Sequence, residues 1–292
     1  MLLSAIPSIF QSVLNLSGLS LIGARVCGVF SLDSLIPLWI ALELNMASFI
    51  LFIYRGRTAK VKLSNYFVAQ RAGSLLFMLA SLSAVGAKFS YLSILFARGG
   101  LILKIGLVPF QLWFIRFIDG LEPKGILLLL TLQKMGPIYL ILKWSPNLAG
   151  GLIVANRAAG VIGMVAQKKR DLFLGYFSLI RAAWMVARGA KVGLLALYAG
   201  ATAAGAAIWL FRGGRGPGAL GWRGASKSGR RYRALLTAAV LALRGLPPIL
   251  SFYVKILLRL QAVKRGTIFG AAFIVFLTPL VLFSLLKVAL RS

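Results

Sequence analysis

Apolar stretches long enough to cross a lipid bilayer recur along almost the whole chain, and no other feature constrains its fold as strongly. A membrane helix needs about 20 mostly apolar residues to span the hydrocarbon layer. Hydrophobic residues make up 60% of the 292 residues, and the mean hydropathy is +0.89. The runs are continuous, whereas a membrane β-barrel would show alternating segments of about ten residues. The sequence therefore predicts an all-α polytopic membrane protein.

We expect about ten membrane-spanning helices in a single integral membrane domain that covers residues 1–292. The first run lacks a basic N-terminal region and a cleavage pattern of small residues, so it is interpreted as a span and not as a signal peptide. A polar loop rich in glycine and arginine is expected outside the membrane at residues 212–233. The expected spans are residues 2–22, 35–54, 66–85, 91–119, 126–144, 148–165, 172–187, 192–211, 234–260 and 267–290.

The net charge of +29 comes from 34 Lys and Arg residues against 5 Asp and Glu residues. Such a charge would normally indicate nucleic acid or anionic lipid as a partner. Many of these basic residues lie inside apolar runs, so they form no solvated patch for phosphates, and we expect no nucleic-acid partner. One cysteine and no histidine exclude a disulfide framework and a Cys/His metal or haem site. We therefore expect no metal and no redox cofactor in this chain.

Four ionisable residues lie well inside apolar runs, and the three lysines among them are close to prolines. A charge at the centre of the bilayer costs about 2.5–3.5 kcal/mol on insertion scales, so such side chains indicate function. Proline removes a backbone donor and frees a carbonyl one turn earlier, which lets the helix open and line a polar cavity. The four residues are Glu43, Lys104, Lys134 and Lys255, and the prolines expected to break their helices are Pro109, Pro137, Pro247 and Pro248.

We predict that these four residues form a proton relay. A lysine kept away from water can bind and release a proton near neutral pH, and a carboxylate that moves closer or further away can switch it. Intramembrane charge combined with a discontinuous helix is typical of ion paths in transporters. The simpler interpretation is that each lysine reaches the membrane interface along its own stem and that the prolines serve packing. All four residues together favour the relay.

Four motifs follow one another in the chain in an order that is specific to one family. They are WIALELNM at residues 39–46, the stretch LKIGLVPFQLWF at 103–114, LQKMGP at 132–137 and GLPPILSFYVK at 245–255, supported by Tyr66, Phe67, Gln70, Gln167 and Tyr176. Together they resemble the mitochondrial NADH dehydrogenase subunit 2 family of respiratory complex I. The resemblance implies an antiporter-like, proton-pumping membrane subunit built from two inverted five-helix repeats, with one discontinuous helix in each.

The resemblance also implies a role for each candidate residue. Glu43 resembles the family's glutamate at the subunit boundary, and Lys104 resembles its ion-pair partner. Lys134 resembles the lysine of the central axis, and Lys255 resembles the lysine of the second broken helix. The expected location is the mitochondrial inner membrane, with other complex I membrane subunits and phospholipids, cardiolipin among the candidates, as partners. FMN and iron–sulfur clusters are expected on partner subunits, with no cofactor in this chain.

Two alternatives to a complex I subunit stay open at this point. A stand-alone cation/proton antiporter would share the broken helices but would act without redox partners. A purely structural membrane scaffold would not need the buried charges to move protons. Loss of proton pumping in a Lys134→Ala variant would reject the scaffold, and purification as an isolated functional unit would favour the antiporter.

The chain departs from the family pattern in two loops and in its arginines. Lys-Lys-Arg-Asp at residues 168–171 and Ile-Arg at 115–116 replace the usual loop residues. Five arginines in spans would together cost on the order of 12–17 kcal/mol if buried unpaired. Our hypothesis is that some are serines in the protein, because many invertebrate mitochondria read AGA and AGG as serine. The alternative is that they are genuine and face headgroups or a cavity. The five are Arg71, Arg98, Arg181, Arg188 and Arg244.

Overall fold

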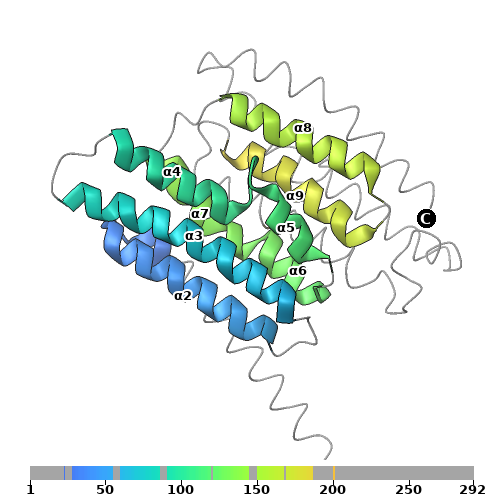
Figure 1. Ribbon diagram of the computed structural model, residues 1–292, viewed down its shortest axis with the longest axis horizontal. Coiled ribbons are helices and arrows are strands. Elements are labelled where there is room, and N and C mark those ends of the chain that lie inside the picture. Colours follow the sequence, from blue (N-terminus) through green and yellow to red (C-terminus); the bar gives the residue numbers. More distant parts are fainter. Residues whose placement is uncertain are drawn as a thin grey trace, which may run out of the picture. The chain divides into compact units, whose positions relative to one another are not determined.

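The computed structural model describes residues 23, 28–54, 60–85, 91–119, 121–144, 150–167, 169–186 and 200. Within these ranges the chain forms the helices labelled in Figure 1. They are α2 (Leu35–Tyr54), α3 (Lys60–Val85), α4 (Tyr91–Ile105), α5 (Gln111–Ile118), α6 (Pro123–Leu130), α7 (Leu132–Trp144), α8 (Gly150–Ala166) and α9 (Arg170–Val186).

The chain divides into two compact units, and each is described by itself. The first unit comprises Met1–Ile105 and Gly120–Pro137, so it contains α2, α3, α4, α6 and the beginning of α7. The second unit comprises Gly106–Asp119 and Ile138–Ser292, so it contains α5, the rest of α7, α8 and α9. The single membrane domain over residues 1–292 stays a prediction.

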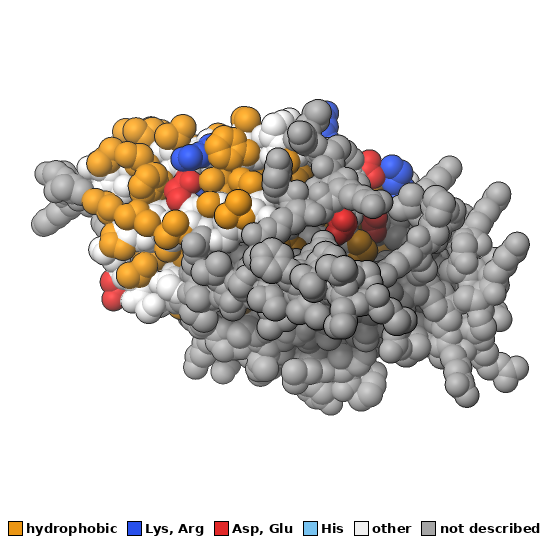
Figure 2. Space-filling view, turned by 90° about the horizontal axis from the view of Figure 1, so that it is seen from below, with side chains coloured by type: hydrophobic (Ala, Val, Ile, Leu, Met, Phe, Trp, Pro, Cys, Tyr) orange, Lys and Arg blue, Asp and Glu red, His pale blue; other side chains and the backbone are white. Residues whose placement is uncertain are grey.

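Helix α2 in the first unit is apolar on both of its faces. Its buried face carries Leu38, Leu42 and Phe49, and its exposed face carries Ile40 and Leu44. A helix that is apolar all round belongs in the core of a large protein or in a membrane. Figure 2 shows the same property from the outside, because orange side chains cover much of the described surface and few charged ones interrupt them.

Two helical stretches among the described residues are long and apolar enough to cross a membrane, judged by length and composition. One is Leu35–Ile53, which lies within α2, and the other is Pro123–Lys143, which runs through α6 and α7. A shorter apolar helix covers Gly151–Ala166. These helices fit the polytopic membrane class that the sequence predicts.

Helices α3 and α4 lie side by side in the first unit (Figure 1) and approach closely through two glycines. A Cβ atom added to Gly100 would lie 2.5 Å from the Gly73 carbonyl oxygen. A Cβ atom added to Gly73 would lie 2.9 Å from the Gly100 carbonyl oxygen and 2.8 Å from Cγ of Lys104. Only glycine permits this backbone contact, since any side chain would force the helices apart.

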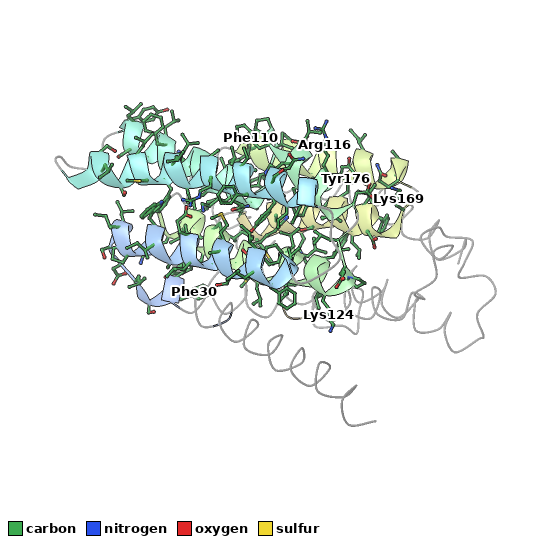
Figure 3. The ribbon with its side chains drawn as sticks, turned by 60° about the horizontal axis from the view of Figure 1, so that its bottom comes forward. Phe30, Phe110, Arg116, Lys124, Lys169 and Tyr176 are labelled. Atoms are coloured by element: carbon green, nitrogen blue, oxygen red, sulfur yellow. The ribbon has the colours of Figure 1, made fainter. Side chains whose placement is uncertain are left out.

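The second unit packs α8 against α9 and α5 against α9. Glycine again allows a close approach, because a Cβ atom on Gly175 would lie 2.9 Å from Cδ1 of Ile118. An exposed ion pair joins the end of α5 to the start of α9, with Nζ of Lys169 3.0 Å from Oδ1 of Asp119. Lys169 and Arg116, which also belongs to this unit, are labelled in Figure 3. Exposed pairs of this kind contribute at most about 1 kcal/mol to stability.

The boundaries of several predicted spans need correction; the span predicted at residues 66–85, for example, begins at Lys60. The span predicted at residues 126–144 begins earlier, at Pro123, and it is interrupted at Thr131 between α6 and α7. Pro137 lies inside α7, so the prediction that it breaks its helix is wrong. The interruption arises at Thr131 because its backbone leaves the helical region, with φ −115° and ψ −86°.

Several predicted features lie outside the described residues. These are the spans at residues 2–22, 234–260 and 267–290, the span at 192–211 apart from residue 200, and the polar loop at 212–233. The predicted second discontinuous helix near residues 245–255 is among them.

Candidate functional site

The span predicted at residues 91–119 is two helices, and the break follows Lys104 directly. Helix α4 ends at Ile105, and Gly106 then adopts the left-handed conformation with φ +74°. A Cβ atom at Gly106 would also lie 2.8 Å from Cβ of Phe114, so glycine is required for both conformation and space. The turn that follows contains a cis Val108–Pro109 bond and closes when the backbone N–H of Phe110 donates to the Leu107 carbonyl at 2.7 Å. The break after Lys104 therefore includes Pro109.

Side chains satisfy the backbone groups that the break sets free. In an unbroken helix the Lys104 carbonyl would accept a hydrogen bond from the N–H of Val108. Instead, Nε2 of Gln70 donates to the Lys104 carbonyl at 3.0 Å. The Val108 N–H donates to Oδ1 of Asn156 at 3.0 Å. Both amides are buried, so each supplies a partner where water cannot.

Lys104 is buried beside the break, with 6% of its surface exposed. Its stem lies against α3, because its Cγ is the nearest atom to the position that a Cβ of Gly73 would occupy. The Lys104 ammonium lies within electrostatic range of both Glu43 and Arg71. The break therefore sets a buried lysine next to a carboxylate and a guanidinium.

Glu43 on α2 forms an ion pair with Arg71 on α3, with 3.5 Å between Oε2 and Nη1. The Glu43 side chain is 15% exposed and the Arg71 side chain is 52% exposed, so the arginine reaches a mostly buried carboxylate from the outer side. The guanidinium also lies over the Phe67 ring, 5.2 Å from its centroid. Sequence reasoning paired Glu43 with Lys104 and missed Arg71.

The serine hypothesis assumed that the five arginines are buried and unpaired, and the structure shows otherwise for three of them. Arg71 is half exposed and paired with Glu43. Arg98 on α4 and Arg181 on α9 also have interaction partners. The energetic objection to these arginines assumed unpaired burial, and that assumption does not hold here. Arg188 and Arg244 lie outside the described residues.

Lys134 is 5% exposed and lies in the first turn of α7, just after the interruption at Thr131. Its backbone N–H donates to the Thr131 carbonyl at 3.2 Å. The preceding residue, Gln133, forms an amide pair with Asn45 on α2, at 3.2 Å from Nδ2 of Asn45 to Oε1 of Gln133 and 3.3 Å for the return bond. Asn45 is two residues beyond Glu43, so this pair ties the helix of the carboxylate to the helix of the lysine.

The first unit thus contains three of the four predicted relay residues, Glu43, Lys104 and Lys134. Lys255, Pro247 and Pro248 lie outside the described residues. Sequence reasoning assigned no role to the amides of Asn45, Gln70, Gln133 and Asn156. Gln70 and the Asn45–Gln133 pair could have been suspected, because they stand within apolar runs where an amide needs a partner.

The chain aligns with curated proteins that share one name. NADH-ubiquinone oxidoreductase chain 2 of Artemia franciscana is 29% identical over 231 residues, which are 77% of this chain and 73% of the relative. The protein of the same name from Mareca falcata is 27% identical over 274 residues, 87% of this chain and 78% of the relative. The chain is thus similar to NADH-ubiquinone oxidoreductase chain 2 over most of its length. No family model matches it.

The fold of this chain is shared with solved structures. A chain of respiratory complex I from Thermus thermophilus with bound NADH aligns with a TM-score of 0.78 at 19% identity, covering 95% of this chain and 68% of that chain. A chain of the Mrp complex from Dietzia sp. aligns with a TM-score of 0.75 at 17% identity, covering 92% of this chain and 58% of that chain. The all-α membrane fold predicted from the sequence is confirmed.

Proposed function

We propose that the chain is a proton-translocating, antiporter-like subunit of respiratory complex I in the mitochondrial inner membrane. Protons move along a buried axis of Glu43, Lys104, Lys134 and Lys255, driven by redox chemistry in partner subunits. Those partners are other complex I membrane subunits, and they hold the FMN and the iron–sulfur clusters. Phospholipids, including cardiolipin, surround the chain. Homology to chain 2 of NADH-ubiquinone oxidoreductase supports the membership of the complex.

The observation that carries the proposal is the combination of buried charges with helix interruptions that are close to them in the chain. Lys104 and Lys134 are buried, and each stands within three residues of a helix interruption. A carboxylate on α2 lies within electrostatic range of the first lysine. Charges that are costly in a membrane and are held by irregular backbone are typical of ion paths.

The test replaces a relay lysine in the assembled complex. In a Lys134→Ala variant, we expect the rate of NADH-driven proton translocation into inverted membrane vesicles to fall roughly a hundredfold, the size of a general acid–base contribution. A fluorescent pH probe reports translocation, and native electrophoresis reports how much complex assembles. Normal assembly with normal translocation would refute the relay and favour the scaffold.

Lys124→Ala is the matched control. Lys124 belongs to the same unit but is exposed at the start of α6, where Figure 3 labels it. The Lys124→Ala substitution removes a lysine from the same span without changing a residue of the buried axis, so the rate of proton translocation should stay at the wild-type value. The stand-alone antiporter makes a different prediction, namely that the purified chain exchanges cations for protons without co-migrating with NADH dehydrogenase activity.

A further inference from the structure

The two carboxylate oxygens of Glu43 lie in different surroundings. Oε2 is 3.5 Å from Nη1 of Arg71. Oε1 is buried, and no described residue forms a hydrogen bond with it. A carboxylate can accept hydrogen bonds at both oxygens. In Glu43, Oε2 has a partner in Arg71, whereas Oε1 keeps its capacity to accept a hydrogen bond or a proton.

The packing of α2 on α3 fixes this arrangement. The two helices contact each other, and the rings of Phe49 and Tyr66 meet at a centroid distance of 5.4 Å. Tyr66 is 1% exposed, so this contact is part of the core. Arg71 lies a little more than one turn beyond Tyr66, and the Phe67 ring under its guanidinium limits the directions that the side chain can take.

The two cations near Glu43 differ in chemistry. The guanidinium of Arg71 stays charged in any protein environment, whereas the ammonium of Lys104 can lose its proton. If Lys104 were the only cation, Glu43 would lose its counter-charge each time the lysine became neutral. With Arg71 present, the carboxylate keeps a positive partner throughout a cycle of proton transfer.

We propose that Arg71 is a positioning residue of the relay, which holds Oε2 of Glu43 so that Oε1 is the oxygen that exchanges a proton. This inference rests on the proposed function and adds a member to its site. A proton that reaches Oε1 comes from the neighbouring group of the relay, so a bond to hydrogen breaks in that group as the O–H bond forms, and the reverse step restores both; the Oε2 contact with Arg71 persists.

The test compares four variants in the assembled complex: Arg71→Gln, Arg71→Lys, Glu43→Gln, and the double variant Glu43→Gln with Arg71→Gln. We expect Arg71→Gln to slow proton translocation at least about tenfold, the size of losing one contact to a charged group. Arg71→Lys should stay near the wild-type rate, because the structure shows a single contact, through Nη1, and a lysine at this half-exposed position, unlike the buried Lys104, would stay charged. The double variant should match Glu43→Gln alone, because Arg71 acts only through Glu43.

An infrared difference spectrum between the complex with and without NADH reports the protonation change at Glu43, which a merely structural role of Arg71 would leave unchanged. Carboxylate bands assigned to Glu43 by their loss in Glu43→Gln should shift in Arg71→Gln and hardly at all in Arg71→Lys. Arg116→Gln is the control for removing an arginine from an apolar helix. Arg116 is exposed on α5 and has no place in the site, so neither translocation nor these bands should change.

Three results would overturn the inference. One is wild-type translocation in Arg71→Gln, and another is a double variant much slower than Glu43→Gln alone. The third is a peptide mass that shows serine at position 71. If Arg71→Gln does not assemble, the double variant decides. Its assembly supports the inference, because the double variant no longer contains the unpaired carboxylate. If the double variant fails to assemble where Glu43→Gln alone assembles, the inference is contradicted. Wild-type translocation in Glu43→Gln would refute the proposed function instead, while the infrared bands would still test the pair.

Discussion

Two buried lysines, Lys104 and Lys134, stand shortly before a proline, and only one of the two prolines lies at a break. Helix α4 ends one residue after Lys104, and the turn that follows contains Pro109. Helix α7 passes through Pro137 and continues to Trp144. A proline by itself therefore does not decide where these helices end.

The difference lies in what surrounds each proline. Before Pro109, Gly106 takes the left-handed conformation, and the amides of Gln70 and Asn156 accommodate the backbone groups that the break frees. Gly136, the residue before Pro137, stays within a helix. The comparison shows that a stable break needs a residue able to leave the helical conformation and polar side chains to satisfy the freed backbone.

The largest expected effect comes from removing the glycine of the break. Gly106→Ala should destabilise the assembled complex by roughly 2–5 kcal/mol, from the left-handed conformation and from overpacking against Phe114. Thermal dissociation followed by native electrophoresis measures it. The control is Gly99→Ala, since a Cβ there meets only Cδ1 of Leu76 at 4.0 Å, and alanine favours the helix. If the two variants were equally stable, the break would not depend on glycine at position 106.

A smaller effect is expected where a side chain satisfies the broken backbone. Gln70→Leu should cost about 1–3 kcal/mol, because the buried Lys104 carbonyl loses its donor. The same thermal measurement applies. Ser83→Ala, at an exposed site on the same helix, serves as the control and should be nearly neutral. If Gln70→Leu left stability unchanged, the Lys104 carbonyl would need no partner. Gly106 alone would then account for the difference between the two prolines.

An effect of opposite sign is expected at Pro137. Because α7 is helical on both sides of it, Pro137→Ala should leave stability unchanged or raise it, by at most about 3 kcal/mol, the difference between proline and alanine inside a helix. Thermal dissociation again decides. A clear loss of stability, or loss of the complex, would show that this proline shapes its surroundings as strongly as the break after Lys104 does.

The break near Lys104 could be predicted because its signals are local. Glycine and proline stand three residues apart just after a buried lysine, and both restrict the backbone. The interruption at Thr131 could not be predicted, because threonine carries no comparable signal. It becomes visible only in the backbone angles of Thr131, with φ −115° and ψ −86°.

The composition of the site could be predicted in part for a similar reason. A charge inside an apolar run stands out in a sequence, and Glu43, Lys104 and Lys134 were found in that way. The pairing of Glu43 with Arg71 depends on how two helices align across 28 positions of chain (71 − 43), and no local pattern fixes that register. The amide partners depend on tertiary packing in the same way.

The contact between Gly73 and Gly100 bears on how the protein can be handled. At that separation no lipid tail and no detergent molecule fits between α3 and α4. The stem of Lys104 lies against the same glycine, so this side of the lysine is surrounded by protein alone. Its environment there should be the same in a bilayer, a nanodisc or a micelle. Differences in activity between a bilayer, a nanodisc and a micelle should therefore arise at exposed positions such as Arg71, which face the surrounding lipid or detergent.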